Sequence, residues 1–359
     1  MNKVKLGQLV SIQTGKLDAN EAVPGGKYPF FTTAKEISCI NEYAYDDEVV
    51  LVAGNGDLNV KYYKGKFNAY QRTYILTSNS NVRMKYLYYF LDKYIEVLRY
   101  QSIGGVIKYI KLNNLSDAQI PMRSTIEQDK IIRILEKLDN EIIIRNKQLS
   151  ELSNLVKSRF NEMFGGNKQF ESIDNLFDII DGDRGKNYPN SDELFDEEYC
   201  LFLNTKNVTK NGFSFITNQF ITETKDKLLR KGKLERYDIV LTTRGTVGNV
   251  AYYDESIKYK HLRINSGMVI LRPKKPNLNQ IFIIHVLRNN NYSRAISGSA
   301  QPQLPITKLK KILLPLPPLS LQNEFADFVA QIDKSQLAIQ KSLEELETLK
   351  KSLMQEYFG

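Results

Sequence analysis

Basic side chains interleaved with aromatic ones are the residues of this sequence best suited to chemistry. They gather in runs such as Lys61-Tyr-Tyr-Lys64 and Lys258 to Arg263. Lys, Arg and Gln can donate hydrogen bonds to phosphates and base edges, and Tyr can pack on a sugar or a base. They predict a nucleic-acid surface, although a solvated surface charge is the default for any single one. The candidate contact residues are Lys61, Lys64, Lys66, Gln71, Arg72, Lys108, Arg184, Lys186, Lys206, Lys227, Arg230, Arg244, Lys260, Arg263 and Gln301.

Arg244 has the most specific position among these candidates. It begins the turn Arg244 to Gly248 between two short β-branched runs, and an earlier stretch repeats the pattern around Gly54 to Asp57. Apolar runs that flank a Gly-rich turn predict a β-hairpin. We favour a hairpin turn over a phosphate-binding loop, because no GxGxxG or GxxxxGK[ST] motif is present.

Residue patterns for catalysis or metal binding are missing. The sequence has no HExxH, CxxC or GxSxG motif and no (D/N)PP(Y/F) tetrapeptide of an amino-methyltransferase. His261 and His285 have no partners at ligand spacing, and Asp181-Gly-Asp183 and Asp192-Glu193 are more typical of acidic surface loops than of metal sites. We therefore expect a chain that is not an enzyme, with no catalytic residue and no metal site.

Composition restricts the class of protein further. The 359 residues carry 50 Lys plus Arg against 41 Asp plus Glu, a net charge of +9, which moderately favours a polyanionic partner. Only Cys39 and Cys200 are present, so a disulfide framework is excluded and a reducing, cytoplasmic setting is expected. No apolar run reaches membrane-spanning length, and the N-terminus does not resemble a signal peptide.

An internal repeat organises the whole chain. Gly104 to Phe164 overlays Gly298 to Phe358 without a gap, at an offset of 194 residues. A weaker repeat precedes each copy, with offsets that rise from 167 to 171 to 190, so the second copy carries extra residues, chiefly between Val208 and Asp238. The order is a variable unit, a similar unit, a second variable unit and a second similar unit.

The similar units are predicted to be long helices. Thr125 to Phe164 contains neither Pro nor Gly, and apolar residues recur there and in the second copy at the heptad spacing of a coiled coil. The predicted seam residues are Ile131, Leu135, Leu138, Ile142, Leu149, Leu152, Val156, Phe325, Val329, Ile332, Ile339, Leu343, Leu346 and Leu353. Thr125 with Gln128 predicts a capping box, and Ser320 a simpler cap.

Polar residues interrupt each seam. Arg145 and Arg159 of the first helix align with apolar residues of the second helix. Gln336 and Lys350 of the second helix likewise align with apolar residues of the first. Because polar seam residues set partner and register, this favours pairing of the two helices within the chain. The alternative is that these long side chains simply extend to solvent from a partly open seam.

The layout resembles the specificity subunit of type I restriction-modification systems. The likeness lies in Gly104 to Ile110 through Pro121 to Gln128, and in Gly298 to Leu304 through Leu314 to Gln322. It extends to the openings of the variable units, Leu6 to Gly15 with Tyr28 to Phe31 and Ile173 to Gly182 with Tyr199 to Asn204. The first unit is short for the family and lacks the inserted Lys-rich stretch.

The resemblance implies an α+β fold with a pseudo-two-fold internal repeat. Two globular mixed α/β target-recognition domains, at 1–120 and 166–315, would be joined by antiparallel coiled-coil helices within the helical spacers 121–165 and 316–359. Each domain would read one half of a bipartite double-stranded DNA site. A helix of roughly 38 residues spans ~57 Å, enough to separate two readers by a duplex turn of ~34 Å.

The resemblance also implies partners. Two modification subunits, which bind S-adenosylmethionine and methylate adenine, would dock on this chain, and restriction subunits that use ATP and Mg²⁺ would join them. Two alternatives stay open from the sequence: a coiled-coil scaffold without a nucleic-acid role, and the DNA-recognition part of a fused restriction-methylation enzyme.

Overall fold

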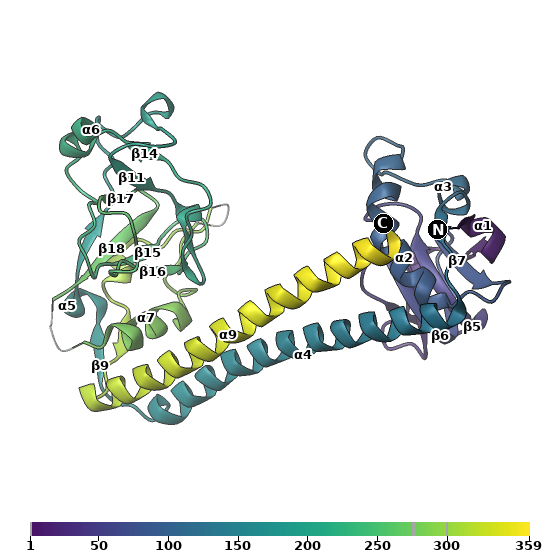
Figure 1. Cartoon of the computed structure of the whole chain (residues 1–359). Helices are drawn as coiled ribbons and strands as arrows, with labels where there is room; N and C mark the ends of the chain where they lie inside the picture. The colour runs from purple at the N-terminus through teal and green to yellow at the C-terminus, as the bar shows by residue number, and fades with distance from the viewer. Residues whose placement is uncertain (1, 275–277, 299–300) are drawn as a thin grey trace. The chain divides into compact units, whose positions relative to one another are not determined.

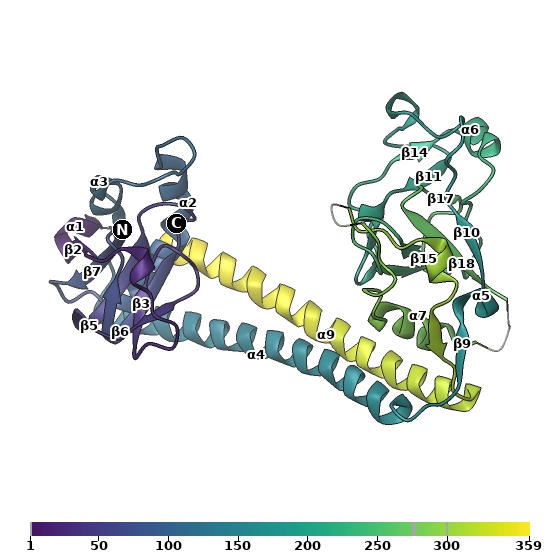
Figure 2. The same cartoon turned by 180° about the vertical axis from the view of Figure 1, so that it is seen from behind.

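The structure is a computed structural model that describes residues 2–274, 278–298 and 301–359. It divides into two compact units, shown in Figures 1 and 2. Unit 1 comprises residues 1–149 and 338–359, and unit 2 comprises residues 150–337. Each unit therefore contains one globular part and a portion of each long helix.

Unit 1 is built on a six-stranded sheet with the strand order β2-β7-β5-β6-β3-β4. Hairpin β5–β6 is antiparallel, with Val52 opposite Val60, which confirms the first predicted hairpin. The elements of the globular part are β1 (Lys3–Lys5), α1 (Leu6–Leu9), β2 (Val10–Thr14), β3 (Tyr28–Phe31), β4 (Ser38–Ile40), β5 (Tyr45–Ala53), β6 (Val60–Ala69), β7 (Thr73–Ser78), α2 (Met84–Gln101), α3 (Leu112–Ser116) and β8 (Gln119–Pro121).

Both faces of the central strand β5 are buried. Val50 and Val52 belong to a core that includes α2 and the first half of the first long helix. Val49 and Leu51 point into a second, smaller core around Phe67. Because successive strand residues face opposite sides, alternate residues of this run supply the two cores.

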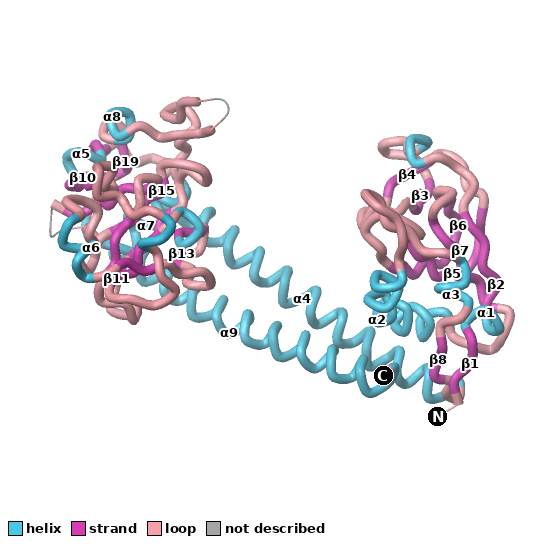
Figure 3. Tube along the Cα trace, turned by 90° about the horizontal axis from the view of Figure 1, so that it is seen from above, coloured by secondary structure: helices cyan, strands magenta, loops and turns pink. Residues whose placement is uncertain are grey.

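Unit 2 has shorter strands and more loop, as Figure 3 shows. Its main sheets have the orders β10-β18-β15-β16 and β14-β11-β17. Antiparallel β15–β16 confirms the second predicted hairpin. The elements are β9 (Phe170–Ser172), α5 (Ile173–Leu176), β10 (Phe177–Asp181), β11 (Cys200–Leu203), β12 (Val208–Thr209), β13 (Gly212–Phe213), β14 (Phe220–Ile221), α6 (Glu223–Leu228), β15 (Ile239–Thr242), β16 (Val250–Tyr252), β17 (Leu262–Ile264), β18 (Met268–Pro273), α7 (Gln280–Asn289), α8 (Ile306–Leu309) and β19 (Leu313–Pro315).

The strand pairings confirm the internal repeat. Strand β1 pairs with β8 in unit 1 as β9 pairs with β19 in unit 2, at the predicted offsets of 167 and 194 residues. The extra residues of the second copy form β12 and β13 before β14, and α6 after it. Strand β14 itself is the counterpart of β4, because it pairs antiparallel with β11 as β4 pairs with β3. Where unit 1 has the single strand β6, unit 2 has β16 and β17 separated by residues 253–261, and β17 keeps the parallel pairing that the end of β6 makes with β3.

The long helices are α4 (Thr125–Phe164) and α9 (Leu319–Phe358), each of 40 residues. In unit 1, Lys350 Nζ lies 2.6 Å from Asp139 Oδ1, and in unit 2, Arg159 Nη2 lies 2.8 Å from Glu324 Oε1. Arg123, just before α4, contacts Tyr357 in unit 1, and Ser153 contacts Gln336 in unit 2. Within each unit, partner numbers in α9 fall as numbers in α4 rise, so the helix portions pair antiparallel, as Figures 1 and 2 show. This confirms the predicted antiparallel helix pair.

The predicted seam residues line the paired faces of the helices. Ile131, Leu135 and Leu138 are buried in unit 1, and Phe325, Val329 and Ile332 are buried in unit 2. Three of the four polar seam residues contact the opposite helix: Arg159 and Lys350 through the ion pairs above, and Gln336 through a 3.1 Å hydrogen bond from Nε2 to Ser153 Oγ. Arg145 instead donates to Gln148 of its own helix.

The predicted helix starts need correction. The capping box of α4 uses Ser124 and Glu127, because Glu127 Oε2 accepts hydrogen bonds from the backbone N–H and hydroxyl of Ser124. Thr125 is already the first helical residue. Ser320 is likewise inside α9, which begins at Leu319, so it is not a cap.

Gln128 is buried and joins two elements rather than capping the helix. Its Oε1 accepts a 2.9 Å hydrogen bond from the Arg83 backbone N–H at the start of α2, and its Nε2 donates to Arg123 O at 2.9 Å. In unit 2, Gln322 Oε1 accepts a 3.1 Å hydrogen bond from Asn279 N, and Gln322 Nε2 donates to Pro317 O at 2.8 Å. In both units one glutamine thus fixes the long helix to the helix of the globular part.

Candidate nucleic-acid interface

In unit 1, three loops converge around the turn of hairpin β5–β6. Gly54 N donates to Arg72 O at 2.8 Å, and Gly56 N donates to Lys108 O at 2.9 Å. The exposed side chains of Arg72 and Lys108 therefore flank this turn. Gln71 lies beside Arg72 and donates to Asp18 Oδ1 at 2.7 Å. We call this surface, formed by residues 54–57, 70–72 and 103–109, the unit 1 rim.

The other predicted contacts of unit 1 lie on β6 and are engaged with the fold. Lys61 donates to Ala34 O at 2.7 Å and to Asn59 Oδ1, and burial lowers the pKa of Lys61. Lys64 pairs with Glu48 at 3.3 Å. The Lys66 ammonium lies 4.6 Å from the centroid of the Tyr43 ring.

Unit 2 repeats the rim around the turn of hairpin β15–β16. Thr243 N and Arg244 N donate to Gly267 O at 2.8 and 3.1 Å, and Leu304 N donates to Thr243 O at 2.8 Å. The Nε atom of Arg244 is buried and has no hydrogen-bond partner among the described residues. The fold therefore leaves part of this guanidinium unused. We call residues 243–248, 265–267, 297–298 and 301–303 the unit 2 rim.

Two further predicted arginines lie beside the unit 2 rim. Arg184 Nη2 lies 3.1 Å from Asp181 Oδ2. The same atom lies 3.5 Å from the backbone oxygen of Ser266, which is a residue of the rim. Arg230 N donates to Asp183 Oδ2 at 2.7 Å, and its guanidinium approaches Gly185. Backbone hydrogen bonds from Gly185 and then Arg230 outweigh burial and lower the pKa of Asp183. Asp183 thus has a structural role in holding the Arg184 and Arg230 segments together.

The remaining predicted contacts of unit 2 differ in position. Lys186, Lys206, Lys260 and Gln301 are exposed. Lys227 is exposed too, and pairs with Glu223 on α6 at 2.8 Å. Lys206 follows Thr205, whose methyl group packs near Gly267 of the rim.

The interpretation of Arg263 needs correction. Its side chain is 4% exposed and donates to Asp226 Oδ1 at 2.8 Å, Asp226 O at 2.8 Å and Lys231 O at 2.6 Å. All of its contacts are internal, so Arg263 holds α6 and the following loop on β17. The basic run around it concealed this role, because a sequence pattern does not separate a buried ion pair from a surface charge.

Two residues in or beside the rims were missed. Lys210 is exposed in the β12–β13 turn and lines a cavity of about 760 Å³ with Lys206, Thr246 and Asn249. Its proximity in sequence to Lys206 could have indicated it. Asn55, in the unit 1 turn, carries no charge and gave no signal.

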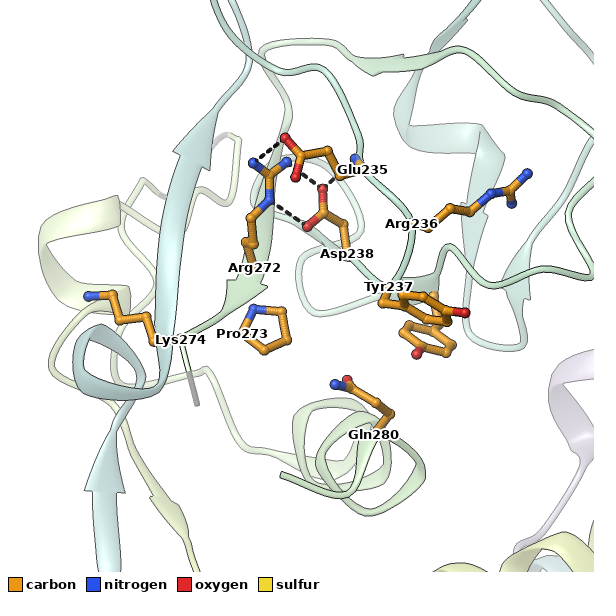
Figure 4. Close-up of a pocket in the computed structure, with 9 residues that line it drawn as sticks. Glu235, Arg236, Tyr237, Asp238, Arg272, Pro273, Lys274 and Gln280 are labelled. Atoms are coloured by element: carbon orange, nitrogen blue, oxygen red, sulfur yellow. Dashed lines mark hydrogen bonds and ion pairs between the residues drawn. The ribbon is translucent and has the colours of Figure 1, made fainter. Parts of the chain in front are cut away.

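A second cavity, of about 620 Å³, lies beside β15 and β18 in unit 2 (Figure 4). Its carboxylates Asp238 and Glu235 are paired with Arg272 at 2.8 and 2.7 Å. Burial, followed by the nearby charge of Asp254, raises the pKa of Tyr252 to about 12. Both carboxylates of this cavity are thus held in ion pairs within unit 2.

Among residues 2–274, 278–298 and 301–359, no group of three or more His, Cys, Asp or Glu side chains is arranged to hold a metal ion. Within the same ranges, no helix combines the length and the apolar character needed to cross a membrane.

A family comparison identifies the repeated architecture. The type I restriction modification DNA specificity domain matches residues 1–154 and again residues 167–349. The chain belongs to this family. Both globular parts are thus target-recognition domains of a type I specificity subunit, and such subunits are in general non-catalytic.

Individual relatives agree with this assignment. The EcoDI specificity subunit of Escherichia coli is 27% identical over 99% of this chain and 87% of the relative. The MjaVIII specificity subunit of Methanocaldococcus jannaschii is 23% identical over 98% of this chain and 90% of the relative. These specificity subunits are therefore similar over nearly their whole length.

Solved structures share the fold. The S subunit of a type I system from M. genitalium superimposes with a TM-score of 0.65 at 18% identity, covering 100% of this chain and 96% of that one. A chain from a study of the assembly and conformational transition of the type I system gives a TM-score of 0.61 at 15% identity, covering 99% and 97%. The predicted fold class is confirmed.

Proposed function

We propose that this specificity subunit reads a bipartite, asymmetric site on double-stranded DNA, with one half recognised by each unit. The supporting observation is the rim that both units repeat: a hairpin turn held against the same neighbouring loops and surrounded by Arg, Lys and amide side chains. One frame with different side chains suits two different half-sites, because base identity is read by side-chain donors and acceptors.

The same proposal includes the partners. Two modification subunits would dock on this chain, bind S-adenosylmethionine and methylate adenine, and restriction subunits using ATP and Mg²⁺ would join them in the cytoplasm. This chain would contribute recognition and half-site spacing and would bind no cofactor.

A gel-shift assay with the purified chain, alone and with modification subunits, tests the proposal. We expect selective duplex binding whose affinity falls linearly with the logarithm of salt concentration, because phosphate contacts release counterions. Arg244→Ala should weaken binding to the selected duplex by about 10-fold, the loss expected for one base contact. A scaffold without a nucleic-acid role would bind no duplex selectively under either condition.

The matched control is Arg133→Ala, which removes the same side chain from an exposed position on α4. Its selective affinity should stay within about twofold of the unmodified chain. Equal losses in both variants would show that only net charge matters, and would contradict a reading role for Arg244.

A further inference from the structure

We propose that Asn55 and Arg244 are equivalent base-reading residues, Asn55 reading an adenine in one half-site and Arg244 a guanine in the other. This inference rests on the proposed function and adds the bases to it.

The strand register places the two residues at the same position. Ala53 pairs with Thr73 at the end of β5, and Thr242 pairs with Met268 at the end of β15. The next residue donates in each case to a carbonyl just before the neighbouring strand: Gly54 N to Arg72 O and Thr243 N to Gly267 O, both at 2.8 Å. Asn55 and Arg244 follow directly.

The opposite side of each turn is held alike. Ile110 N donates to Gly54 O at 2.9 Å, and Leu304 N donates to Thr243 O at 2.8 Å. Asn55 forms a β-bridge with Tyr109, and Arg244 forms one with Gln303. The two partners, Tyr109 and Gln303, are separated by the repeat offset of 194 residues. The two side chains are therefore presented by matching backbone frames.

A glycine follows each of them in the same conformation. Gly56 has φ 70° and Gly245 has φ 71°, and an added Cβ at either position would meet no atom within 4 Å. The positive φ, which glycine adopts without steric cost, turns the chain at this point. The open space beside both glycines leaves room for a ligand to approach Asn55 and Arg244.

Both side chains keep hydrogen-bonding groups that have no partner among the described residues. A turn asparagine commonly accepts a hydrogen bond from the backbone two residues on. The half-buried Asn55 amide makes no side-chain hydrogen bond among the described residues, and Arg244 Nε is buried without a partner there. Polar groups that the fold leaves without a protein partner at matching positions are free to bond a ligand, and the buried Arg244 Nε gains most from one.

The chemistry of the two side chains assigns the bases. In the major groove, Asn can bond the N6 and N7 atoms of adenine, and Arg can bond the O6 and N7 atoms of guanine. Exposed Arg72 and Lys108 flank Asn55, and Arg184 lies on the rim of Arg244, where cations can hold phosphates. Phosphate contacts of this kind position a reader, and the base contacts supply the specificity.

The sequence conceals this equivalence. The offset of 190 that aligns Asn59-Val60 with Asn249-Val250 would place Gly54, not Asn55, opposite Arg244. The pairings instead give an offset of 189 at the end of β5 and 190 at the start of β6, so the second turn has one more residue.

Selection from a library of random duplexes, read by sequencing, tests the inference with the full chain, alone and with modification subunits. The unmodified chain should enrich a bipartite motif. Asn55→Arg should change one position of one half-site from A to G, and Arg244→Asn should change one position of the other half-site from G to A. Each change should exceed about 10-fold in base preference.

The half-site read by the unaltered unit, together with the melting temperature, serves as the folding control in each variant. Arg133→Asn is the matched surface substitution and should leave both half-sites unchanged. A bipartite motif that neither exchange alters, or exchanges that act on the same half-site, would overturn the inference and leave the proposed function standing. Absence of any motif for the unmodified chain would overturn both.

Discussion

At the residue scale, the buried ion pair of unit 2 shows how charge can serve the fold instead of the ligand. Asp226 is 1% exposed and accepts hydrogen bonds from Arg263 and Lys233. Burial alone would raise the pKa of Asp226, but the hydrogen bonds from Lys233 and Arg263 outweigh it and lower the pKa. A buried carboxylate of this kind is costly once a partner is lost.

We therefore expect Arg263→Gln to destabilise unit 2 by about 3 kcal/mol, the loss typical of a broken buried pair. Differential scanning calorimetry at pH 7 should show the unfolding midpoint of unit 2 lowered by about 6 °C or more. Because the folded pKa of Asp226 is depressed, its stabilisation is complete above the unfolded value near 3.9 and is lost as the pH falls through the folded pKa. The difference between variant and unmodified chain should accordingly shrink in strong acid.

Lys227→Gln is the matched control, since its exposed pair with Glu223 on the same helix should contribute less than about 1 kcal/mol. An unfolding midpoint of Arg263→Gln equal to that of this control would show that the guanidinium is not needed for folding.

At the element scale, the sequence predicted periodic features well and single contacts poorly. Heptad spacing located α4 from Thr125 to Phe164, because a repeated apolar face specifies a long helix by many small preferences that agree. Gln128 was assigned to a cap, whereas it is buried and hydrogen-bonded to the start of α2. The difference arises because a polar residue that bonds a distant backbone has the same local pattern as a capping residue.

The contacts between α4 and α9 also differ between the units in which element supplies the cation near a seam aspartate. In unit 1, Asp139 accepts a hydrogen bond from the Tyr89 hydroxyl at 2.9 Å and pairs with Lys350 of α9. The corresponding position of Asp139 in unit 2 is Asp333. Burial raises the pKa of Asp333, and the positive charge of Arg288 on α7 offsets only part of this rise. The copies thus use different elements for the same electrostatic need.

Lys350→Met should destabilise unit 1 in a pH-dependent way. Burial raises the pKa of Asp92, and Lys350 opposes this rise, so loss of the lysine should raise that pKa further. A carboxyl group with a raised folded pKa is destabilising above that pKa and recovers stability as the pH falls through it. We expect a lower unfolding midpoint for unit 1 at pH 7 by calorimetry and a partial recovery at pH 5.

Asp92→Asn provides the internal check, because it removes the charge that Lys350 offsets. The double variant should unfold at a higher temperature at pH 7 than Lys350→Met alone, with less recovery at pH 5. If Asp92→Asn failed to rescue Lys350→Met, the lysine would act only through packing or through Asp139.

At the scale of the whole molecule, the duplication could be predicted from the sequence because it extends over the entire chain. The offset of 194 residues reappears in the starts of α4 and α9 and in the ends of β8 and β19. The variable units were less predictable: their strands are short and are paired by contacts distant in sequence, so their registers emerged only from the structure. The rims lie in these units, which explains why the site was predicted less completely than the helices.

The continuous helices predict that their length determines the spacing between half-sites. Deleting residues 143–149 of α4 together with 340–346 of α9 removes one heptad from each helix at facing positions, since Asp139 faces Lys350 and Ser153 faces Gln336. Whole heptads preserve the seam. Each deletion shortens its helix by about 10.5 Å, comparable to three base pairs of duplex.

Random-duplex selection with the doubly shortened chain should therefore return the same two half-sites with a spacer shorter by one to about three base pairs. The half-site sequences serve as the control, because the rims lie outside the deleted segments and should read the same bases. Deleting residues 143–149 alone should abolish the bipartite motif, since the two helices would then differ in length by seven residues and could not keep their contacts in both units. An unchanged spacer in the double deletion would mean that some other feature of the complex sets the distance, and the helices would then serve only to join the two readers.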